Sequence, residues 1–409
     1  MLNKKQEREL AYVVLIDEIK PIEGYDRVEY ARTGGWWVIV QKGQFKVGDP
    51  AIYFEIDSKV PSDKECFNFL EKRNYKVKTI KMCKVISQGL LMKAEDFGWK
   101  TISTESLDGI MYIEDDEGKL HFATDETRFL TKKLGVVYAT EEDNKRKANS
   151  VDKYKKMAQR HPNIFKNKFV RKIMKYKAGR KFMFFFFGKK KKDKYGWPEW
   201  VVKTDEERIQ NMPWILNDDG CWVVTEKIDG TSTTFTMKRG KHNKNKFYVC
   251  SRNVCFDSID NPCYYDNNVY WEMAKKYDMY NVLSKLLNKF PDIDWVTVQG
   301  ETYGSNVQKR DYSINEHDFA AFNLITSKQG RFNSIDMKNI LEELNVPCVP
   351  IILEEFYFKV DNKVEDILEF AEGNSVIDGK EREGLVFRSE DGSKSFKAVS
   401  NSYLLKYHG

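Results

Sequence analysis

The chain has 409 residues, of which 32% are charged and 41% hydrophobic, a balance typical of a globular protein with a sizeable core. No apolar run approaches the roughly 20 residues that a membrane helix needs, and the N-terminus lacks the apolar segment of a secretion signal. The seven cysteines form no C-x-x-C pair, and five histidines leave little material for histidine-based chemistry. We expect an intracellular protein, cytoplasmic or nuclear, with reduced thiols, several domains and no membrane partner.

The first hundred residues contain short β segments separated by glycine-rich turns. Strands are expected at 11–19, 27–31, 36–40, 51–56 and 77–91. Such even spacing favours a small barrel, and the OB-fold is a barrel of this size that often binds nucleic acid. A plain structural β domain is the alternative that these residues leave open. We place this first domain at residues 1–110.

The middle of the chain is strongly basic. Between residues 144 and 195 there are 20 lysines and arginines and two acids, although the whole chain has a net charge of only +6. This charge predicts a nucleic-acid partner, because each cation that neutralises a phosphate releases a counterion. The alternative is a solvated basic stretch. We treat residues 111–196 as a basic helical connector, with a helix near 164–176. The residues expected to bind nucleic acid are Lys189, Lys190, Lys191 and Lys192.

From residue 197 the pattern changes to mixed α and β structure. Strands are expected at 222–225, 231–237, 247–250, 295–300 and 319–325, and helices at 270–290, 337–344 and 364–371. The last two helices have apolar residues at i, i+3, i+4 and i+7, and Gly373 is placed to end the final one. The chain is therefore expected to be α+β, with a separate domain at residues 197–409.

One tetrapeptide in this domain points to chemistry. Lys227-Ile228-Asp229-Gly230 has the form K-x-D-G, which arises by chance in such a chain with a probability on the order of one in ten. A lysine amine has a pKa near 10.4, so neutralising it at pH 7 costs about 4–5 kcal/mol. An attacking lysine therefore needs a second lysine or a carboxylate-bound metal nearby. Taken singly, each candidate is more often a solvated surface group. The candidates are Asp229, Glu301 and Glu383 as acids and Lys397 as the second lysine.

Five further motifs follow Lys227 in a fixed order. They are Ser251-Arg252-Asn253, Gln299-Gly300-Glu301, Phe319 to Asn323, Glu383 to Arg388, and Ser395-Phe396-Lys397. In order and approximate spacing, the six resemble motifs I, Ia, III, IIIa, IV and V of the covalent nucleotidyltransferases, which comprise DNA ligases, RNA ligases and mRNA capping enzymes. The resemblance implies a ligase-type nucleotidyltransferase domain with antiparallel sheets and flanking helices.

The resemblance also implies a role for each residue. Lys227 would attack the α-phosphate of ATP, and Lys397 would bind that phosphate and stabilise charge in the transition state. Arg252 would touch the nucleotide and the 5′-phosphate, Glu301 the ribose, and Phe322 the adenine ring. The expected catalytic residues are Lys227, Asp229, Glu383 and Lys397. The expected ligands of Mg²⁺ or Mn²⁺ are Asp229, Glu383 and Glu301. The expected nucleotide-binding residues are Glu226, Arg252, Glu301, Phe322, Lys203, Arg208 and Lys406.

Two positions depart from the family pattern. Asn323 stands where the family usually has an aspartate, which predicts a weaker contact at that edge of the pocket. Ser395 stands where the last motif usually has its first lysine, with Lys394 beside it and Lys406 downstream. The identity of the second phosphate-binding lysine therefore stays open.

Domain order narrows the resemblance. In DNA ligases and capping enzymes an OB domain follows the catalytic domain, but only twelve residues follow Lys397 here. A preceding barrel resembles the RNA ligase 5 family, the Deinococcus-type ligases. The stretches that support this resemblance are 36–61, Ser87 to Leu91 and Lys203 to Asn211.

This family resemblance implies a function. The expected protein is a monomeric, ATP-dependent RNA ligase that seals 3′-OH/5′-phosphate breaks through a lysyl-AMP intermediate. It would act in RNA repair on RNA or on a duplex that contains RNA. Two alternatives are a capping-type guanylyltransferase, which would use GTP, and an inactive RNA-binding protein on the same scaffold.

Overall fold

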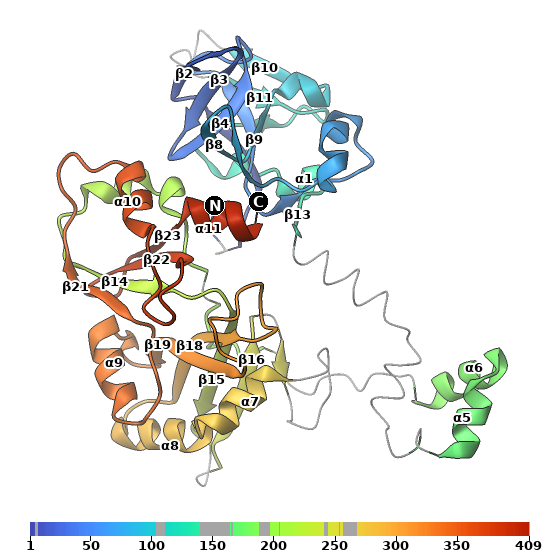
Figure 1. Cartoon of the computed structure of the whole chain (residues 1–409), viewed down its shortest axis with the longest axis vertical. Helices are drawn as coiled ribbons and strands as arrows, with labels where there is room; N and C mark the ends of the chain where they lie inside the picture. The colour runs from blue at the N-terminus through green and yellow to red at the C-terminus, as the bar shows by residue number, and fades with distance from the viewer. Residues whose placement is uncertain are drawn as a thin grey trace.

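The structure of the chain is a computed structural model. It describes residues 1–4, 7–103, 111–139, 164, 167–187, 197–203, 205–240, 244–252, 254–256 and 268–408. Figure 1 shows a β-rich N-terminal domain above a C-terminal domain with two sheets, and helices α5 (Lys168–Met174) and α6 (Lys177–Phe187) apart from both. Among these residues, no helix is long and apolar enough to span a membrane.

The N-terminal domain is built from small antiparallel sheets. One has the order β1-β5-β9 (Ala11–Leu15, Pro50–Phe54, Leu90–Met92) and another the order β2-β3-β4 (Glu18–Ile22, Tyr25–Thr33, Trp36–Gln41). The remaining small sheets are β7-β8 (Thr79–Met82, Val85–Gln88), β10-β11-β12 (Lys100–Ser103, Met111–Glu114, Leu120–His121) and β6-β13 (Ser58–Lys59, Val137–Tyr138). Short helices complete the domain: η1 (Glu65–Arg73), η2 (Ala94–Phe97), η4 (Glu126–Arg128) and α1 (Thr131–Leu134).

The local sequence explains these strands. In β4 every second side chain is buried, which is the period of a strand with one face on a core. The strand expected at 77–91 is instead three strands, because the backbone turns at Cys83 and Lys84, both with positive φ, and again at Gly89. The boundary expected at residue 110 falls inside a sheet, since β11 pairs with β10 and β13 pairs with β6. Residues 111–139 therefore pack with the first domain.

The C-terminal domain contains two larger antiparallel sheets. The four-stranded sheet has the order β21-β14-β22-β23 (Ile351–Phe356, Trp222–Lys227, Gly384–Ser389, Ser395–Val399). The six-stranded sheet has the order β17-β16-β15-β18-β19-β20 (Cys255–Phe256, Lys246–Ser251, Thr231–Lys238, Trp295–Gly304, His317–Thr326, Gly330–Arg331). The five strands expected in this domain from the sequence are all present.

Helices cover these sheets. Helices α7 (Val269–Lys276), α8 (Met279–Lys289) and α9 (Ser334–Glu342) share a core with the six-stranded sheet, and α10 (Val364–Ala371) packs on the four-stranded sheet. The single helix expected at 270–290 is two, because Asp278 has a φ of 47° between them. The helix expected at 364–371 is confirmed at those bounds.

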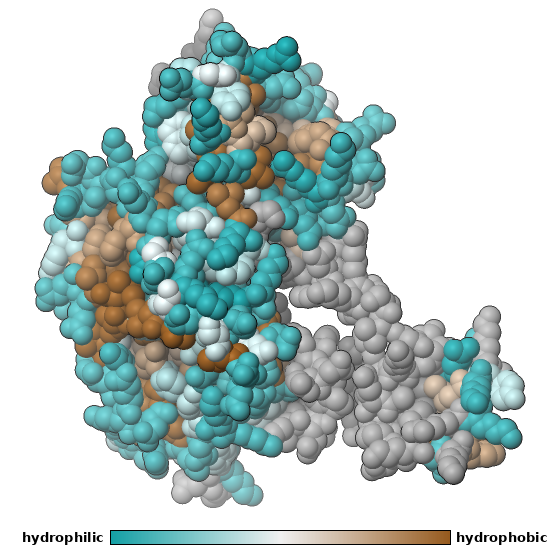
Figure 2. Space-filling model, viewed as in Figure 1, coloured by the Kyte–Doolittle hydropathy of each residue, from teal (hydrophilic) through white to brown (hydrophobic). Residues whose placement is uncertain are grey.

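The C-terminal domain also contains short helical segments, some of which contact the N-terminal domain. They are η5 (Ile209–Asn211), η6 (Pro213–Asn217), α11 (Asn401–Tyr403) and η8 (Leu404–His408). Leu404 lies in the same buried cluster as Trp36 and Tyr53 of the N-terminal domain, so the end of the C-terminal domain packs into the core of the first. Hydrophilic side chains cover much of the visible surface of both domains (Figure 2), in line with the high charge content.

Candidate active site

The two sheets of the C-terminal domain meet at the K-x-D-G turn. Strand β14 ends at Lys227 in the four-stranded sheet, and β15 begins at Thr231 in the six-stranded sheet. Lys227 lies opposite Gly384 in the β14–β22 register, which places Glu383 next to the lysine. A side chain on Gly230 would lie 2.3 Å from the carbonyl oxygen of Thr302, so only glycine permits this close approach of strands β15 and β18.

Lys227 forms an ion pair with Glu383. Its Nζ donates to a carboxylate oxygen of Glu383 at 2.7 Å, and 24% of the lysine side chain is exposed. Burial alone would lower the pKa of this amine. Glu383, Glu301 and Asp229 outweigh burial, and the pKa of Lys227 lies above its ordinary value. The lysine is therefore held as an ammonium ion.

Two further carboxylates complete this cluster. Glu301 lies opposite Ser232 in the β15–β18 register, and burial, with Glu383 and Asp229 nearby, raises its pKa to about 8. Asp229 is held from two sides. Its backbone N–H donates to the Tyr312 hydroxyl at 2.6 Å, and its carboxylate accepts from the Tyr403 hydroxyl at 2.7 Å.

Lys397 is buried near this cluster and binds Asp205. Its Nζ donates to the Asp205 carboxylate at 3.0 Å, and the same carboxylate accepts from Arg252 at 2.8 Å and from Arg8 at 3.5 Å. Burial lowers the pKa of Lys397 to about 8 although Asp205 opposes this, and Arg8, Arg208 and Lys227 lower it further. Asp205 thus gathers two cations of the motif series and one from the N-terminal domain.

The residues after Asp205 continue these links. Arg208 pairs with Lys397 in a parallel β-bridge, and its guanidinium lies 3.3 Å from Asp57 of the N-terminal domain. Glu206 accepts from Arg388 at 3.0 Å and also binds the Ser395 hydroxyl. Ser395, which stands where a lysine was expected, therefore lies in a cluster with Glu206 and Arg388.

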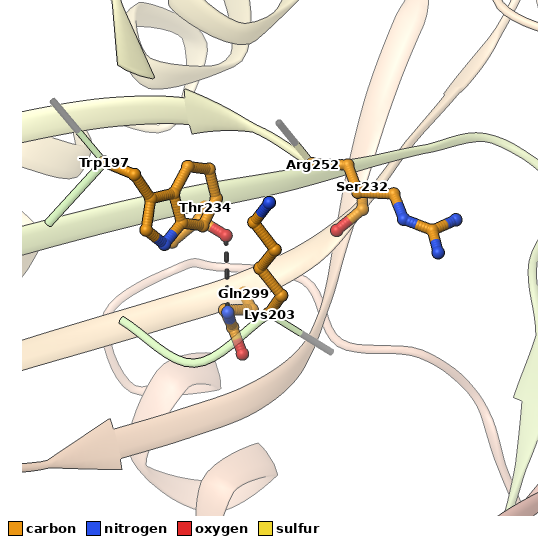
Figure 3. A pocket seen from close by; sticks show the side chains of 6 residues that line it. All are labelled: Trp197, Lys203, Ser232, Thr234, Arg252 and Gln299. Atoms are coloured by element: carbon orange, nitrogen blue, oxygen red, sulfur yellow. Dashed lines mark hydrogen bonds between the residues drawn. The ribbon is translucent and has the colours of Figure 1, made fainter. Parts of the chain in front are cut away.

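A shallow pocket lies beside this segment. It is lined by Trp197, Lys203, Ser232, Thr234, Arg252 and Gln299. Figure 3 shows Lys203 extending toward Trp197, while Ser232, Thr234 and Gln299 come from the central strands of the six-stranded sheet. The amine of Lys203 lies 5.3 Å from the centre of the Trp197 ring, a cation–π contact. Lys203 and Arg252 give this pocket positive charge.

Asn323 has a specific role in the fold. Its amide donates to the side-chain oxygen of Gln299 at 3.0 Å, and Gln299 donates in turn to the carbonyl of Val202 at 2.9 Å. An ionised aspartate at position 323 could not donate this bond. The asparagine therefore supports the segment that carries Lys203, beside the pocket.

The other expected nucleotide contacts are spread around the turn. Phe322 packs in the cluster that contains Ile228, and the Arg388 guanidinium lies 5.7 Å from the centre of its ring. Glu226 is buried and accepts from the backbone N–H of Val376 at 2.8 Å, and burial raises its pKa.

The remaining expected residues lie elsewhere. Lys406 is exposed and pairs with Glu381 at 3.4 Å, while Lys189, Lys190, Lys191 and Lys192 lie outside the described residues.

The fold brings several residues into the site that no sequence motif marks. Arg8, Tyr312 and Tyr403 belong to none of the six motifs, and no local pattern distinguishes them. Asp205 lies in the stretch Lys203 to Asn211, which supports the family resemblance, but its three partners come from distant parts of the chain.

Replacing Asp205 should change the titration of Lys397. In Asp205→Asn the lysine loses the carboxylate that favours its charged form, so its pKa should fall below about 8 and the amine should become neutral at lower pH. NMR titration of ¹³C-labelled lysines measures this. The matched control is Asp218→Asn, which removes the partner of Lys394, the residue just before the strand that carries Lys397. An unchanged or higher Lys397 pKa in Asp205→Asn would show that Asp205 does not control this amine.

Removing the Tyr403 hydroxyl should destabilise the protein. Tyr403→Phe removes one hydrogen bond to the Asp229 carboxylate, and a hydrogen bond to a charged group contributes about 1.5–3 kcal/mol. Tyr53→Phe is the control, because that buried hydroxyl donates to a neutral carbonyl, with a contribution of about 0.5–1.5 kcal/mol. Urea denaturation compares the two variants. Equal losses would show that the Asp229 contact has no special strength.

Comparisons with known proteins agree with this architecture. Residues 220–408 match the RNA ligase family model, and residues 10–94 match an OB-fold domain model. No match was found among curated protein sequences. The N-terminal domain is thus the OB-fold domain expected from the sequence.

Solved structures of an RNA ligase from Naegleria gruberi have a similar fold. The form with pyrophosphate aligns with a TM-score of 0.68 and 24% identity, over 98% of this chain and 99% of that one. A lysine-to-methionine mutant with AMP and Mn aligns with a TM-score of 0.69 and 25% identity, over 98% and 99%. The C-terminal domain therefore has the sequence pattern of the RNA ligase family, and the whole chain has the fold of the Naegleria enzyme.

Proposed function

We propose that the chain is an ATP-dependent RNA ligase that seals 3′-OH/5′-phosphate breaks through AMP bound to Lys227. The observation that carries this proposal is the Lys227 amine, 2.7 Å from Glu383 on a turn between two sheets, with Lys397 buried nearby. The match of residues 220–408 to the RNA ligase family supports it. So do the Naegleria structures, which contain ATP or AMP with Mn.

The reaction has three phosphoryl-transfer steps. In the first, Lys227 Nζ loses a proton and attacks the α-phosphorus of ATP, so that an N–P bond forms while the bond to pyrophosphate breaks. In the second, the AMP moves to an RNA 5′-phosphate and frees the lysine. In the third, a 3′-OH attacks that phosphate, the strand is sealed and AMP leaves. Positioning and charge stabilisation provide most of the catalysis in such reactions.

The carboxylates near Lys227 fit a divalent cation. Among the described residues, no group of three or more His, Cys, Asp and Glu side chains is arranged to hold a metal by itself. Mg²⁺ is usually bound through one or two carboxylates together with substrate phosphates, so Asp229 and Glu383 would hold it jointly with ATP. A cation bound there reduces the negative charge around Lys227 and favours the neutral amine that attacks.

The other predicted residues would contact different parts of the nucleotide. Lys397 and Arg252 would bind phosphate together, because the single carboxylate of Asp205 holds the two cations close to each other. Phe322 would contact the adenine ring. Glu301, with a pKa of about 8, is largely protonated at pH 7, and a neutral carboxyl both donates to and accepts from ribose hydroxyls.

We further assign the chain to the RNA ligase 5 type, because its OB-fold domain precedes the ligase domain. The OB-fold domain would hold the 3′-OH strand, and Lys189, Lys190, Lys191 and Lys192 would contact the RNA backbone. A monomer acting in cytoplasmic RNA repair fits this assignment. The six described cysteines are free thiols, as a reducing compartment requires.

Labelling tests the proposed function. With α-labelled ATP and Mg²⁺ or Mn²⁺, the wild-type chain should become covalently labelled and then seal a nicked RNA duplex. Lys227→Ala should show neither activity, because it lacks the nucleophile. Lys328→Ala is the control, since that exposed lysine pairs with Asp292 at the surface and has no predicted role in the site.

Three results would contradict the proposal. Covalent label on Lys227→Ala would show that another residue is the nucleophile. Labelling by GTP in preference to ATP would favour the guanylyltransferase. RNA binding without any nucleotide label would favour an inactive scaffold.

A further inference from the structure

A cluster of cations lies where the two domains meet, outside the site described above. Arg73, Lys76 and Lys78 come from the N-terminal domain, and Lys309 comes from the loop between β18 and β19. We call these four residues the junction cations. Arg73 and Lys309 are exposed, and Lys76 and Lys78 are half-buried.

Backbone pairing fixes the three residues of the N-terminal domain. Lys76 forms an antiparallel bridge with Lys59 of β6, which is itself paired with β13. The Val77 N–H donates to Ser58 at 2.9 Å, and the Asp57 N–H donates to Val77 at 3.0 Å. The segment that carries Lys76 and Lys78 therefore runs alongside Asp57.

The C-terminal domain brings Lys309 to the same place. Helix η8 packs against β7, the strand that follows Lys78, and the amine of Lys309 donates to the carbonyl of Tyr407 in η8. The proximity of these cations changes the pKa of Lys78. Its pKa is lowered first by burial and then by Lys309, Lys76 and Arg73. Like charges of both domains are thus close enough to repel one another.

This cluster is connected to the candidate active site. Arg208 pairs with Lys397 in a β-bridge, and its guanidinium lies 3.3 Å from Asp57. The Asp57 carboxylate raises the pKa of Lys78 and so opposes the effect of the neighbouring cations. Positive charge therefore extends from Lys397 through Arg208 to the junction cations, with Asp57 between them.

Repulsion among cations gathered from two domains costs free energy that an anionic ligand can offset. A ligand that contacts both the active-site cations and the junction cations must carry several separated negative charges, because these cations come from both domains. ATP concentrates its charge on one short phosphate chain, which the proposed function already places at Lys227 and Lys397. A nucleic-acid strand repeats its phosphates at regular intervals.

We propose that the junction cations bind backbone phosphates of the RNA strand whose end enters the active site. This inference rests on the proposed function and deepens it, because it names the surface that holds the substrate. Phosphate contacts position a strand without reading its sequence, so this surface should bind RNA of any sequence equally.

The test is a triple variant of the full chain, Lys76→Ala with Lys78→Ala and Lys309→Ala. Binding of a single-stranded RNA with a fluorescent label at its 5′ end and a free 3′-OH is measured over a series of salt concentrations. Three lost contacts, at about 0.7 per phosphate, should reduce the slope of log K against log salt by about 2 and weaken binding at least tenfold at low salt. RNAs of different sequence should lose affinity equally, and labelling by ATP should be unchanged.

The matched control removes the same charge from exposed lysines elsewhere in the N-terminal domain, by Lys42→Ala, Lys46→Ala and Lys100→Ala. Equal effects on RNA binding in both triple variants would overturn the inference, since net charge alone would explain them. So would a higher KM for ATP with unchanged RNA binding, which would assign the junction cations to nucleotide phosphates. If the wild type takes no label from ATP, the proposed function fails, while the RNA measurement still tests this surface.

Discussion

The amine of Lys227 lies 2.7 Å from Glu383 at the point where two antiparallel sheets meet. Glu301 and Asp229 add negative charge around it, so the amine stays protonated despite its burial. Lys397 titrates in the opposite direction, because there burial outweighs the single carboxylate of Asp205. Two lysines of one site thus have pKa values pushed apart, the arrangement by which enzymes separate the roles of like groups. A divalent cation bound with ATP would offset the negative charge of the carboxylates that keep the Lys227 amine protonated.

The short segment 205–208 joins this chemistry to the rest of the molecule. Asp205 binds Lys397, Arg252 and Arg8, and Arg208 reaches Asp57 of the OB-fold domain. Lys397, Arg252 and the first domain are therefore linked through one carboxylate, that of Asp205. This link connects the OB-fold domain to the residues that we propose to bind the nucleotide phosphates. The junction cations extend the same line of positive charge outward.

Much of the fold followed from periodicity. Helix α10 has the bounds that its apolar residues predict, and the five C-terminal strands that were expected are present, although β21, β22 and β23 were not predicted. Local patterns failed where single residues turn the chain. Asp278 splits one expected helix, and the turn at Cys83 and Lys84 divides one expected strand. The boundary at residue 110 was also misplaced relative to the pairing of β10 with β11, because composition does not report which strands pair.

The site shows a similar division. The order of six motifs predicts Lys227, Glu301, Glu383 and Lys397 as site residues, and the fold brings these side chains close to one another. Asp205 and Tyr403 could not be found in this way, because their partners are distant in sequence and each contact depends on the packed fold. The two departures from the family pattern also needed structure to interpret. Asn323 donates to Gln299, and Ser395 binds Glu206 beside Arg388, so both residues fit their own surroundings.

The protonation of Lys227 tests this account most directly. NMR titration of ¹³C-labelled lysines in the full chain gives the pKa of this amine, with Lys227→Arg to assign its signal. The account predicts a pKa above that of an exposed lysine in the free protein. It also predicts a lower pKa in Glu383→Gln and on adding Mg²⁺ with a non-hydrolysable ATP analogue. A Lys227 pKa at or below that of an exposed lysine in the free protein, unchanged by Glu383→Gln, would contradict the account.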